Sequence, residues 1–145
     1  MSSRMVDLSI SIVNWNTKDC LEKCLSSIYE NTKDIVFETA VVDNNSSDDS
    51  VQMVKSRFAD VNLIENKDNV GYGAANNRAI KTAKGRHVLI LNPDTIVLPG
   101  CLGEMVRFLD SRPDVGAVGP RISNPDGTFQ LSCIRNLPTL LSEVF

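Results

Sequence analysis

The segment HVLILNPDT, residues 87–95, decides the fold expected for this chain. It begins with a short apolar run bounded by turn residues, which is typical of a strand buried on both faces. Pro93 has no backbone N–H, so this central strand must end in a turn. The turn leaves Asp94 at the carboxyl end of the strand, where ligands bind in open α/β sheets. Asp94 can hold a hard cation there, or it can bond its own backbone in an Asx turn.

The composition is that of an ordinary globular domain. The chain has 145 residues, of which 42% are hydrophobic and 23% charged, and its net charge is −3. This length favours a single domain that folds without a metal or a disulfide. The mild acidity argues against a nucleic-acid partner, which would need a clustered basic face. The sequence contains no apolar run that could span a membrane or serve as the core of a signal peptide.

The cysteines favour free thiols. Cys20 and Cys24 are four residues apart on an expected helix, in the same stripe as its leucines, which predicts that both are buried. A zinc site would need another close pair or several histidines, and His87 is the only histidine. Reduced cysteines and a cytoplasmic location are therefore expected. The remaining cysteines are Cys101 and Cys133.

Apolar periodicity predicts strands and helices in alternation. Such alternation indicates βαβ units and a mainly parallel sheet, which is an α/β fold. The sequence NPDG at 124–127 predicts a turn that joins a short hairpin. Strands are expected at 8–14, 35–42, 61–64, 87–91 and 115–118. Helices are expected at 17–29, 50–58, 71–84 and 99–109, with Pro99 at the first position of the last one.

Polar turns follow three of these strands. The carboxyl ends of parallel strands meet at one edge of the sheet, around the crevice where the strand order reverses. Each turn alone can simply end a strand. Any parallel sheet gathers such turns at one edge, so their clustering by itself is only moderate evidence for a site. The turns supply Asn14 and Asn16, Asp43 and Asn44, and Asn92 and Asp94.

The residue types at this edge suit a pyrimidine nucleoside diphosphate. The Asp43 carboxylate can accept the N3–H of a uracil or thymine ring. Gly71 and Gly73 permit close backbone approach, and the helix that they open points its N-terminus at the ligand. A dinucleotide site fits less well, because the pattern ends in Asn76 instead of glycine or alanine and follows the third strand.

Four segments form an ordered set of motifs: ISIVNWN at 10–16, VVDNNSSD at 41–48, NVGYGAANNRA at 69–79 and LNPDT at 91–95. As a set they resemble family 2 glycosyltransferases with the GT-A fold. The resemblance implies a Rossmann-like three-layer α/β/α domain, of which residues 1–145 would be the N-terminal, donor-binding fragment without the acceptor part. Two further motifs, VGPRISNPDG at 118–127 and SCIR at 132–135, resemble the bacterial rhamnosyltransferase-like branch, which builds cell-surface polysaccharides.

The resemblance also implies roles for individual residues. Asp43 would read the base, and Asp94 would be the metal-binding carboxylate of the Asp-x-Asp motif, with Asn92 in place of the first carboxylate. A single carboxylate implies weak binding of Mg²⁺ or Mn²⁺ unless the nucleotide diphosphate is present. Val13, Asn14, Asn16 and Asn44 would line the nucleoside pocket, and Gly71, Gly73 and Asn77 would back it.

The implied reaction is inverting transfer of a sugar, with rhamnose as one candidate, from a UDP- or dTDP-sugar to a hydroxyl of a glycan or lipid-linked acceptor. The catalytic base is expected beyond Phe145, because Asp126 belongs to a turn, and the 145-residue chain is expected to be nearly inactive alone. The full-length protein would act in the cytoplasm at the inner face of the membrane. The oligomeric state stays open.

Two other functions remain open at this point. A non-catalytic nucleotide-binding or assembly module would keep the same fold and lack the downstream base. A nucleotidyltransferase would share a related sheet and pyrimidine substrates. The second would normally carry a glycine-rich basic loop after the first strand, and NWNT at 14–17 has neither feature.

Overall fold

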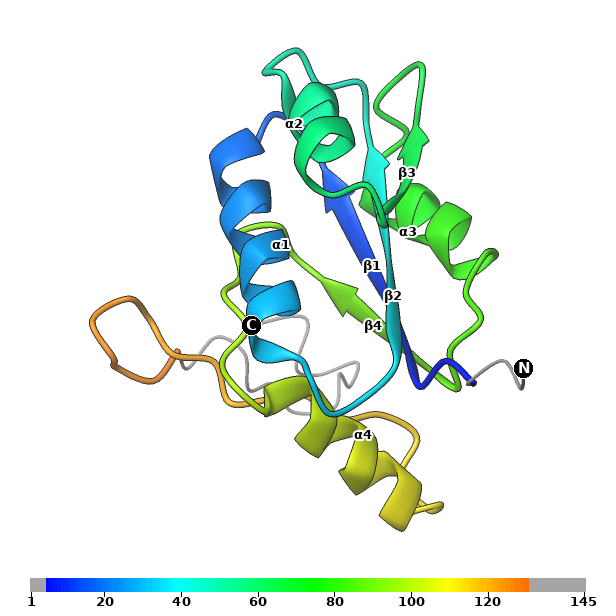
Figure 1. The fold of residues 1–145 in the computed structure, drawn as a ribbon, viewed down its shortest axis with the longest axis vertical. Helices are drawn as coiled ribbons and strands as arrows, with labels where there is room; N and C mark the ends of the chain where they lie inside the picture. The colour runs from blue at the N-terminus through cyan, green and yellow to red at the C-terminus, as the bar shows by residue number, and fades with distance from the viewer. Residues whose placement is uncertain (1–4, 131–145) are drawn as a thin grey trace, which may run out of the picture.

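The computed structural model describes residues 5–130. Strands and helices alternate along the chain, as the sequence predicts, and all eight elements up to α4 are present (Figure 1). The elements are β1 (Leu8–Asn14), α1 (Lys18–Asn31), β2 (Phe37–Asp43), α2 (Ser50–Arg57), β3 (Asn62–Glu65), α3 (Tyr72–Ile80), β4 (His87–Leu91) and α4 (Cys101–Ser111).

The four strands form one sheet in the order β3-β2-β1-β4, and every pair in it is parallel. Helices cover both faces. Side chains of α1, α2 and α4 pack in the larger apolar cluster on one face, and α3 packs in a smaller cluster on the other. Because the strand order reverses between β1 and β4, the carboxyl ends of both strands open onto a crevice at one edge. The expected three-layer α/β/α architecture is confirmed.

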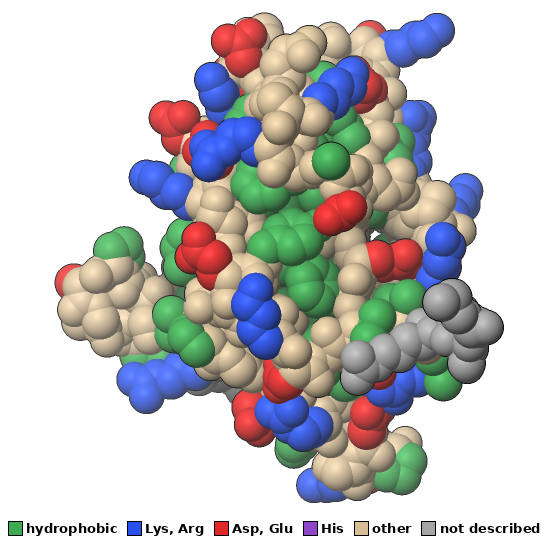
Figure 2. All heavy atoms as spheres, viewed as in Figure 1, with side chains coloured by type: hydrophobic (Ala, Val, Ile, Leu, Met, Phe, Trp, Pro, Cys, Tyr) green, Lys and Arg blue, Asp and Glu red, His purple; other side chains and the backbone are tan. Residues whose placement is uncertain are grey.

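Strand β1 is the centre of the packing. All seven of its residues are buried. Successive side chains point to opposite faces of a strand, so Ile10 and Ile12 enter the larger cluster while Val13 enters the smaller one. Beside the larger cluster the ring of Tyr29 packs on Phe37 and Phe58, at centroid distances of 5.4 and 6.1 Å. Figure 2 shows hydrophobic side chains in the middle of this face, with charged side chains around them.

The prediction that β4 is a central strand buried on both faces is wrong for the described residues. Here β4 lies at the edge of the sheet, and Val88 and Ile90 are 44% and 50% exposed. Leu89 and Leu91 pack against the larger cluster. An apolar run indicates burial but does not say what covers each face, and α3 lies over β1 and β2, short of β4.

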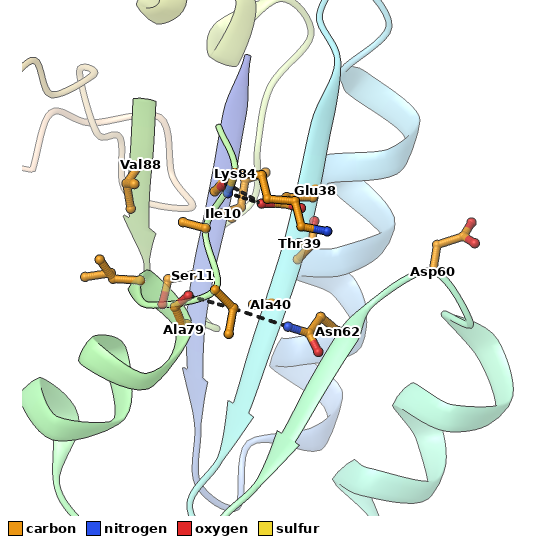
Figure 3. A pocket seen from close by; sticks show the side chains of 14 residues that line it. Ile10, Ser11, Glu38, Thr39, Ala40, Asp60, Asn62, Ala79, Lys84 and Val88 are labelled. Atoms are coloured by element: carbon orange, nitrogen blue, oxygen red, sulfur yellow. Dashed lines mark hydrogen bonds between the residues drawn. The ribbon is translucent and has the colours of Figure 1, made fainter. Parts of the chain in front are cut away.

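A hollow of about 380 Å³ lies on this incompletely covered face (Figure 3). Ser11 of β1, Ala40 of β2, Ala79 of α3 and Val88 of β4 are among the side chains that line it. It continues toward the amino ends of the strands, where Glu38 and Lys84 meet. It is therefore separate from the polar turns at the carboxyl edge.

His87 opens β4 and is half-buried. Its Nε2 lies 2.9 Å from Oδ1 of Asp110, at the end of α4. Arg86 pairs with the same carboxylate at 2.6 Å and with Asp7 at 2.6 Å. Hydrogen bonds lower the pKa of Asp110 to about 2, with the larger contribution from Arg86 and a smaller one from His87. The only histidine therefore ties β4 to α4, at the end of the sheet opposite to the polar turns.

Three local predictions are also wrong. Residues 115–118 are irregular, because their small, largely exposed side chains find no strand to pair with among the described residues. Helix α4 begins at Cys101, after Gly100 with φ +75°, so Pro99 precedes the helix. Cys20 is exposed, because it lies at the margin of the α1 stripe whose centre is Cys24.

The hairpin prediction is confirmed in a minimal form. Ser123 and Phe129 form an isolated antiparallel bridge, and the backbone N–H of Asn124 donates to the carbonyl of Thr128 at 2.8 Å. Gly127 takes a φ of +83°, which glycine adopts without steric cost. Cys133 and the predicted SCIR motif lie outside the described residues.

The backbone at Gly85 passes close to the start of β1, and a substitution there can test how close this contact is. A Cβ added there would lie 2.5 Å from the backbone nitrogen of Ser9 and 2.7 Å from the carbonyl carbon of Leu8. Backbone atoms of a buried strand cannot move aside cheaply, so Gly85→Ala should lower the free energy of unfolding by about 1–3 kcal/mol in urea denaturation. Gly116→Ala is the control, because its Cβ meets no atom within 4 Å. Equal stability of the two variants would contradict the tight crossing.

Candidate functional site

The three polar turns meet at the carboxyl edge of the sheet, as predicted. The parallel register places Asn14 beside Asp43, and the backbone N–H of Asn44 donates to the carbonyl of Asn14 at 2.8 Å. The backbone N–H of Asn66, after β3, donates to the carbonyl of Asp43 at 2.9 Å. Regular pairing therefore continues past the strands and fixes where their last side chains lie.

A buried carboxylate forms the centre of this edge. Asp43 is 2% exposed and Asn14 is fully buried. Nδ2 of Asn14 donates to Oδ1 of Asp43 at 2.8 Å, and the backbone N–H of Ser46 donates to Oδ2 at 2.8 Å. An ionised carboxylate can accept about four hydrogen bonds. Asp43 is thus held by one donor on each oxygen and keeps acceptor capacity for a ligand.

The turns after β1 and β2 are locked to each other by side chains. The hydroxyl of Thr17 donates to Oδ1 of Asn14 at 2.7 Å, so both ends of that amide are engaged. The backbone N–H of Asn16 donates to Oγ of Ser46 at 2.9 Å, and Oδ1 of Asn16 accepts from the backbone N–H of Ser47 at 2.8 Å. Asn16 takes a φ of +54°, a conformation that asparagine tolerates. It therefore acts in this structure as a clamp between two loops.

Asn44 points away from the carboxylate and toward β3. It is 2% exposed, and its Oδ1 accepts from Nδ2 of Asn66 at 2.7 Å. Arg78 of α3 donates in turn to the side-chain oxygen of Asn66. This chain of amides links α3 to the end of β2.

Val13 and Asn77 lie at the margins of the site. Val13 is 7% exposed and packs in the smaller apolar cluster, so it supports the site from below. Asn77 is exposed on α3. Its neighbour Asn76 is buried, accepts from the hydroxyl of Ser11 at 2.8 Å and donates to the carbonyl of Tyr72 at 3.1 Å. Asn76 is therefore the residue that fastens α3 to the sheet.

Open space lies in front of the first turn of α3. Gly71 takes a φ of +81° before the helix, and no side chain caps the helix N-terminus. A Cβ added at Gly71 or Gly73 would meet no atom within 4 Å, so packing does not require glycine at Gly73. Unsatisfied N–H groups at a helix N-terminus favour anions. This combination leaves room for a negatively charged ligand.

The turn after β4 brings a second carboxylate to the same edge. The backbone N–H of Thr95 donates to the carbonyl of Asn92 at 3.3 Å, which closes the turn around Asp94. The hydroxyl of Tyr72, the first residue of α3, donates to Oδ1 of Asn92 at 2.9 Å. Asn92 and Asp94 are both exposed.

The donor set of this turn suits Mg²⁺ or Mn²⁺. An amide oxygen and a carboxylate are hard ligands, and Mg²⁺ is commonly bound by one or two carboxylates together with substrate phosphates. The described residues contain no group of three or more His, Cys, Asp or Glu side chains that would hold a metal unaided. The fit is therefore to a cation that shares its coordination with a diphosphate.

Cys24 lies beneath the same turn but is not a nucleophile. Burial raises the pKa of its thiol to about 12, and the negative charge of Asp94 contributes in the same direction. The thiolate is the reactive form of cysteine. At neutral pH Cys24 therefore stays a neutral thiol.

Several residues of this edge escaped the sequence analysis. Ser46 and Arg78 lie within the family motifs, but the sequence predicted no role for either, and Asn66 lies in no motif at all. A helix-opening tyrosine gives no signal that its hydroxyl will reach a turn after the next strand, as Tyr72 does. These partners depend on tertiary arrangement.

The chain matches the family model for glycosyl transferase family 2 over residues 9–138, so it belongs to that family. Its relatives include N-acetylglucosaminyl-diphospho-decaprenol L-rhamnosyltransferase of Mycobacterium tuberculosis, which is 30% identical over 92% of this chain and 47% of that protein. The chain thus spans about half the length of this relative.

Solved structures agree with the fold. TarS 1–349 of S. aureus in complex with UDP-GlcNAc is 26% identical, with a TM-score of 0.67 over 81% of this chain and 38% of that one. The mannosyltransferase PcManGT of Pyrobaculum calidifontis, in complex with GDP-Man and Mn²⁺, is 26% identical, with a TM-score of 0.73 over 86% and 37%. The architecture is that of GT-A glycosyltransferases, and the resemblance stated from the motifs is confirmed.

The buried amide–carboxylate pair gives a pH-dependent test. In Asn14→Asp the introduced carboxyl group would face Asp43 at hydrogen-bond distance, and one of the two must keep a proton. The carboxyl group that keeps its proton has a higher pKa in the folded variant than in the unfolded chain. The folded variant is therefore favoured at low pH, and its free energy of unfolding falls as the pH rises above the ordinary aspartate range. Chemical denaturation should show a loss of roughly 2 kcal/mol between about pH 4.5 and about pH 7.5, relative to wild type.

Asn14→Ala is the matched control for this substitution. It removes the donor and adds no charge, so its destabilisation should vary less with pH. Parallel pH profiles for the two variants would mean that Asn14 and Asp43 are not closely coupled.

Proposed function

We propose that residues 1–145 form the donor-binding part of an inverting glycosyltransferase that transfers a sugar from a UDP- or dTDP-sugar to a hydroxyl acceptor. The observation that carries the proposal is the buried Asp43 carboxylate. It lies at the carboxyl edge of the sheet, at the end of β2 and beside β1, is held from both sides, and keeps acceptor capacity.

The base side of the donor would be recognised through Asp43. Uracil and thymine each present one N–H between two carbonyls, and a fixed carboxylate can accept that N–H. Asn14 and Ser46 hold Asp43 in one orientation before any ligand arrives. Preorganised donors and acceptors cost little ordering on binding. Val13, Asn16 and Asn44 would then shape the nucleoside pocket around Asp43.

The diphosphate side would lie between the start of α3 and the turn after β4. Gly71 and Gly73 leave the space, with Asn77 behind them, and the helix N-terminus favours the negative charge. Asp94, with the Asn92 amide oxygen, would hold Mg²⁺ or Mn²⁺ against the phosphates. The cation would stabilise the negative charge that develops on the leaving nucleoside diphosphate.

The acceptor and its base are proposed to lie outside the shared segment, because the chain spans under half of each of the relatives compared. Asp126 is an unsuitable base, since its Oδ1 accepts from the backbone N–H of Thr128 at 2.9 Å and from its hydroxyl at 2.6 Å. Full transfer would thus require a longer polypeptide.

The relatives support a proposal for the substrate class. The mycobacterial relative is named for rhamnosyl transfer to a lipid-linked sugar, and TarS was solved with a UDP-sugar. We therefore propose rhamnose as the candidate sugar and a glycan or lipid-linked acceptor, in bacterial cell-surface polysaccharide synthesis at the inner face of the membrane. In this proposal the full-length protein would associate with the membrane peripherally. Among the described residues, no helix combines the length and the apolar character that a membrane span requires.

Calorimetric titration with UDP and dTDP, with and without Mn²⁺, tests the donor site. Wild type should bind one of the nucleotides, and Mn²⁺ should tighten binding. Asp43→Ala should weaken binding about tenfold or more in both conditions, because it removes a hydrogen bond to a charged group. Asp94→Asn should abolish most of the Mn²⁺ effect and leave nucleotide binding without Mn²⁺ unchanged. Asp60→Asn is the control, since Asp60 is exposed at the opposite end of the sheet.

The outcomes separate the parts of the proposal. Unchanged binding in Asp43→Ala would contradict base recognition by that carboxylate. Absence of nucleotide binding from folded wild type would contradict a donor site in this chain. Nucleotide binding by a longer polypeptide that transfers no sugar would favour the non-catalytic module.

Gly73→Leu tests the space in front of α3. A Cβ added at Gly73, in the first helical turn, meets no atom within 4 Å, and leucine is a better helix former than glycine by about 0.5–1 kcal/mol. Thermal unfolding should therefore show equal or higher stability. Nucleotide binding should weaken strongly, because the side chain would occupy the place proposed for the phosphates. Undiminished binding in this variant would place the phosphates elsewhere.

A further inference from the structure

The segment that carries Asp94 is irregular, yet its backbone is firmly held. Residues 92–100 contain no strand or helix. The backbone N–H of Val97 donates to Oγ of Ser27 at 2.9 Å, and the carbonyl of Val97 accepts from Nδ2 of Asn31 at 2.8 Å. Both backbone groups of this buried residue are thus satisfied by side chains of α1 rather than by a strand.

Cys24 makes the corresponding contacts one helical turn earlier. Its thiol donates to the carbonyl oxygen of Asn92, with Sγ and that oxygen 3.8 Å apart. The residue is fully buried. It therefore contacts the same carbonyl that closes the turn around Asp94.

The three residues form a polar stripe along one side of α1, consisting of Cys24, Ser27 and Asn31. Their spacing of three and four places them in line on a helix. The hydroxyl of Ser27 donates to the carbonyl of Cys24 at 2.7 Å, so its oxygen is left to accept from Val97. The backbone N–H of Gly100 also donates to the carbonyl of Asn31, at 3.3 Å. The stripe thus fixes the segment from the turn to the start of α4.

We propose that the polar stripe of α1 positions Asp94 for the shared cation and diphosphate, so that Cys24, Ser27 and Asn31 are positioning residues of the donor site. The inference rests on the proposed function. It follows from the exposure of Asp94, which leaves the place of this residue to be set by the backbone on either side. Displacement of a ligand by about 1 Å weakens such a site substantially.

Ser27→Ala tests the inference against a purely structural role. The readout is the ratio of UDP affinity, or of dTDP affinity if wild type prefers it, measured with and without Mn²⁺. Loss of one hydrogen bond that places the turn should lower this ratio about threefold to tenfold. Affinity without Mn²⁺ should stay near that of wild type, because Asp43 is untouched.

Ser9→Ala is the matched control. Ser9 is 5% exposed and Ser27 is 6% exposed. Oγ of Ser9 also accepts a backbone N–H from a distant segment, from Gly85 at 2.8 Å, but at the opposite end of the sheet, where it also bonds Glu38 and Lys84. Both variants should lower the melting temperature. Only Ser27→Ala should lower the Mn²⁺ ratio.

A second pair of variants keeps the test decisive if Ser27→Ala does not fold. Cys24→Ser retains a donor and an acceptor, so it should keep more of the Mn²⁺ ratio than Cys24→Ala. Equal ratios in wild type, Ser27→Ala and Cys24→Ala would overturn the inference and leave the proposed function intact. Absence of any Mn²⁺ effect in wild type would overturn the metal part of the proposed function and this inference together.

Discussion

The parallel pairing of β1 with β2 on one side and with β4 on the other is the constraint on which the rest of this structure depends. Its register places Asn14 next to Asp43 and Ile12 next to Leu91, so three chain segments far apart in sequence leave the sheet together. Parallel strands need crossover helices, and these helices cover both faces. Polar groups can then gather only where the strands end.

The carboxyl edge of the sheet holds the buried carboxylate of Asp43, a group that is ordinarily left exposed to solvent. A buried carboxylate is costly unless it is hydrogen-bonded, and here the donors are an asparagine amide and a turn N–H. Those donors are themselves fixed, by Thr17 and by the interlocked loops of Asn16 and Ser46. The groups that bond Asp43 are thus held by further hydrogen bonds of their own, and this buried polar network specifies one arrangement of the two turns.

Much of the fold could be predicted because periodicity reports local structure. The alternation of strands and helices, the parallel sheet and the placing of Asp43 and Asp94 at one edge all follow from apolar runs that end in polar turns. The exposure of Val88 and Ile90 could not be predicted, because an apolar run says nothing about which neighbour covers it. The prediction that Cys20 is buried was wrong for a related reason, because a spacing of four residues does not show where the apolar stripe of α1 ends.

The site partners were hidden for a different reason. Cys24, Ser27 and Ser46 are small residues whose side chains each make a hydrogen bond to a backbone group far away in sequence. No local pattern encodes such a partner. Ser27 in particular stands between buried apolar positions of α1 and reads as an ordinary small core residue.

The two ends of the proposed donor site are built on different principles. The base end is rigid through side chains: Asp43 is buried and held directly. The metal end is rigid through the backbone, since Asp94 is exposed and only the chain around it is anchored, by α1 below and by Tyr72 through Asn92. A carboxylate that must share a cation with an arriving diphosphate benefits from this design, because its side chain can adjust while its position cannot. The base end has no such need, because a flat ring with one central N–H demands a fixed acceptor. A turn that offers one carboxylate instead of two agrees with the proposal that the cation is shared between Asp94 and the phosphates of the nucleotide.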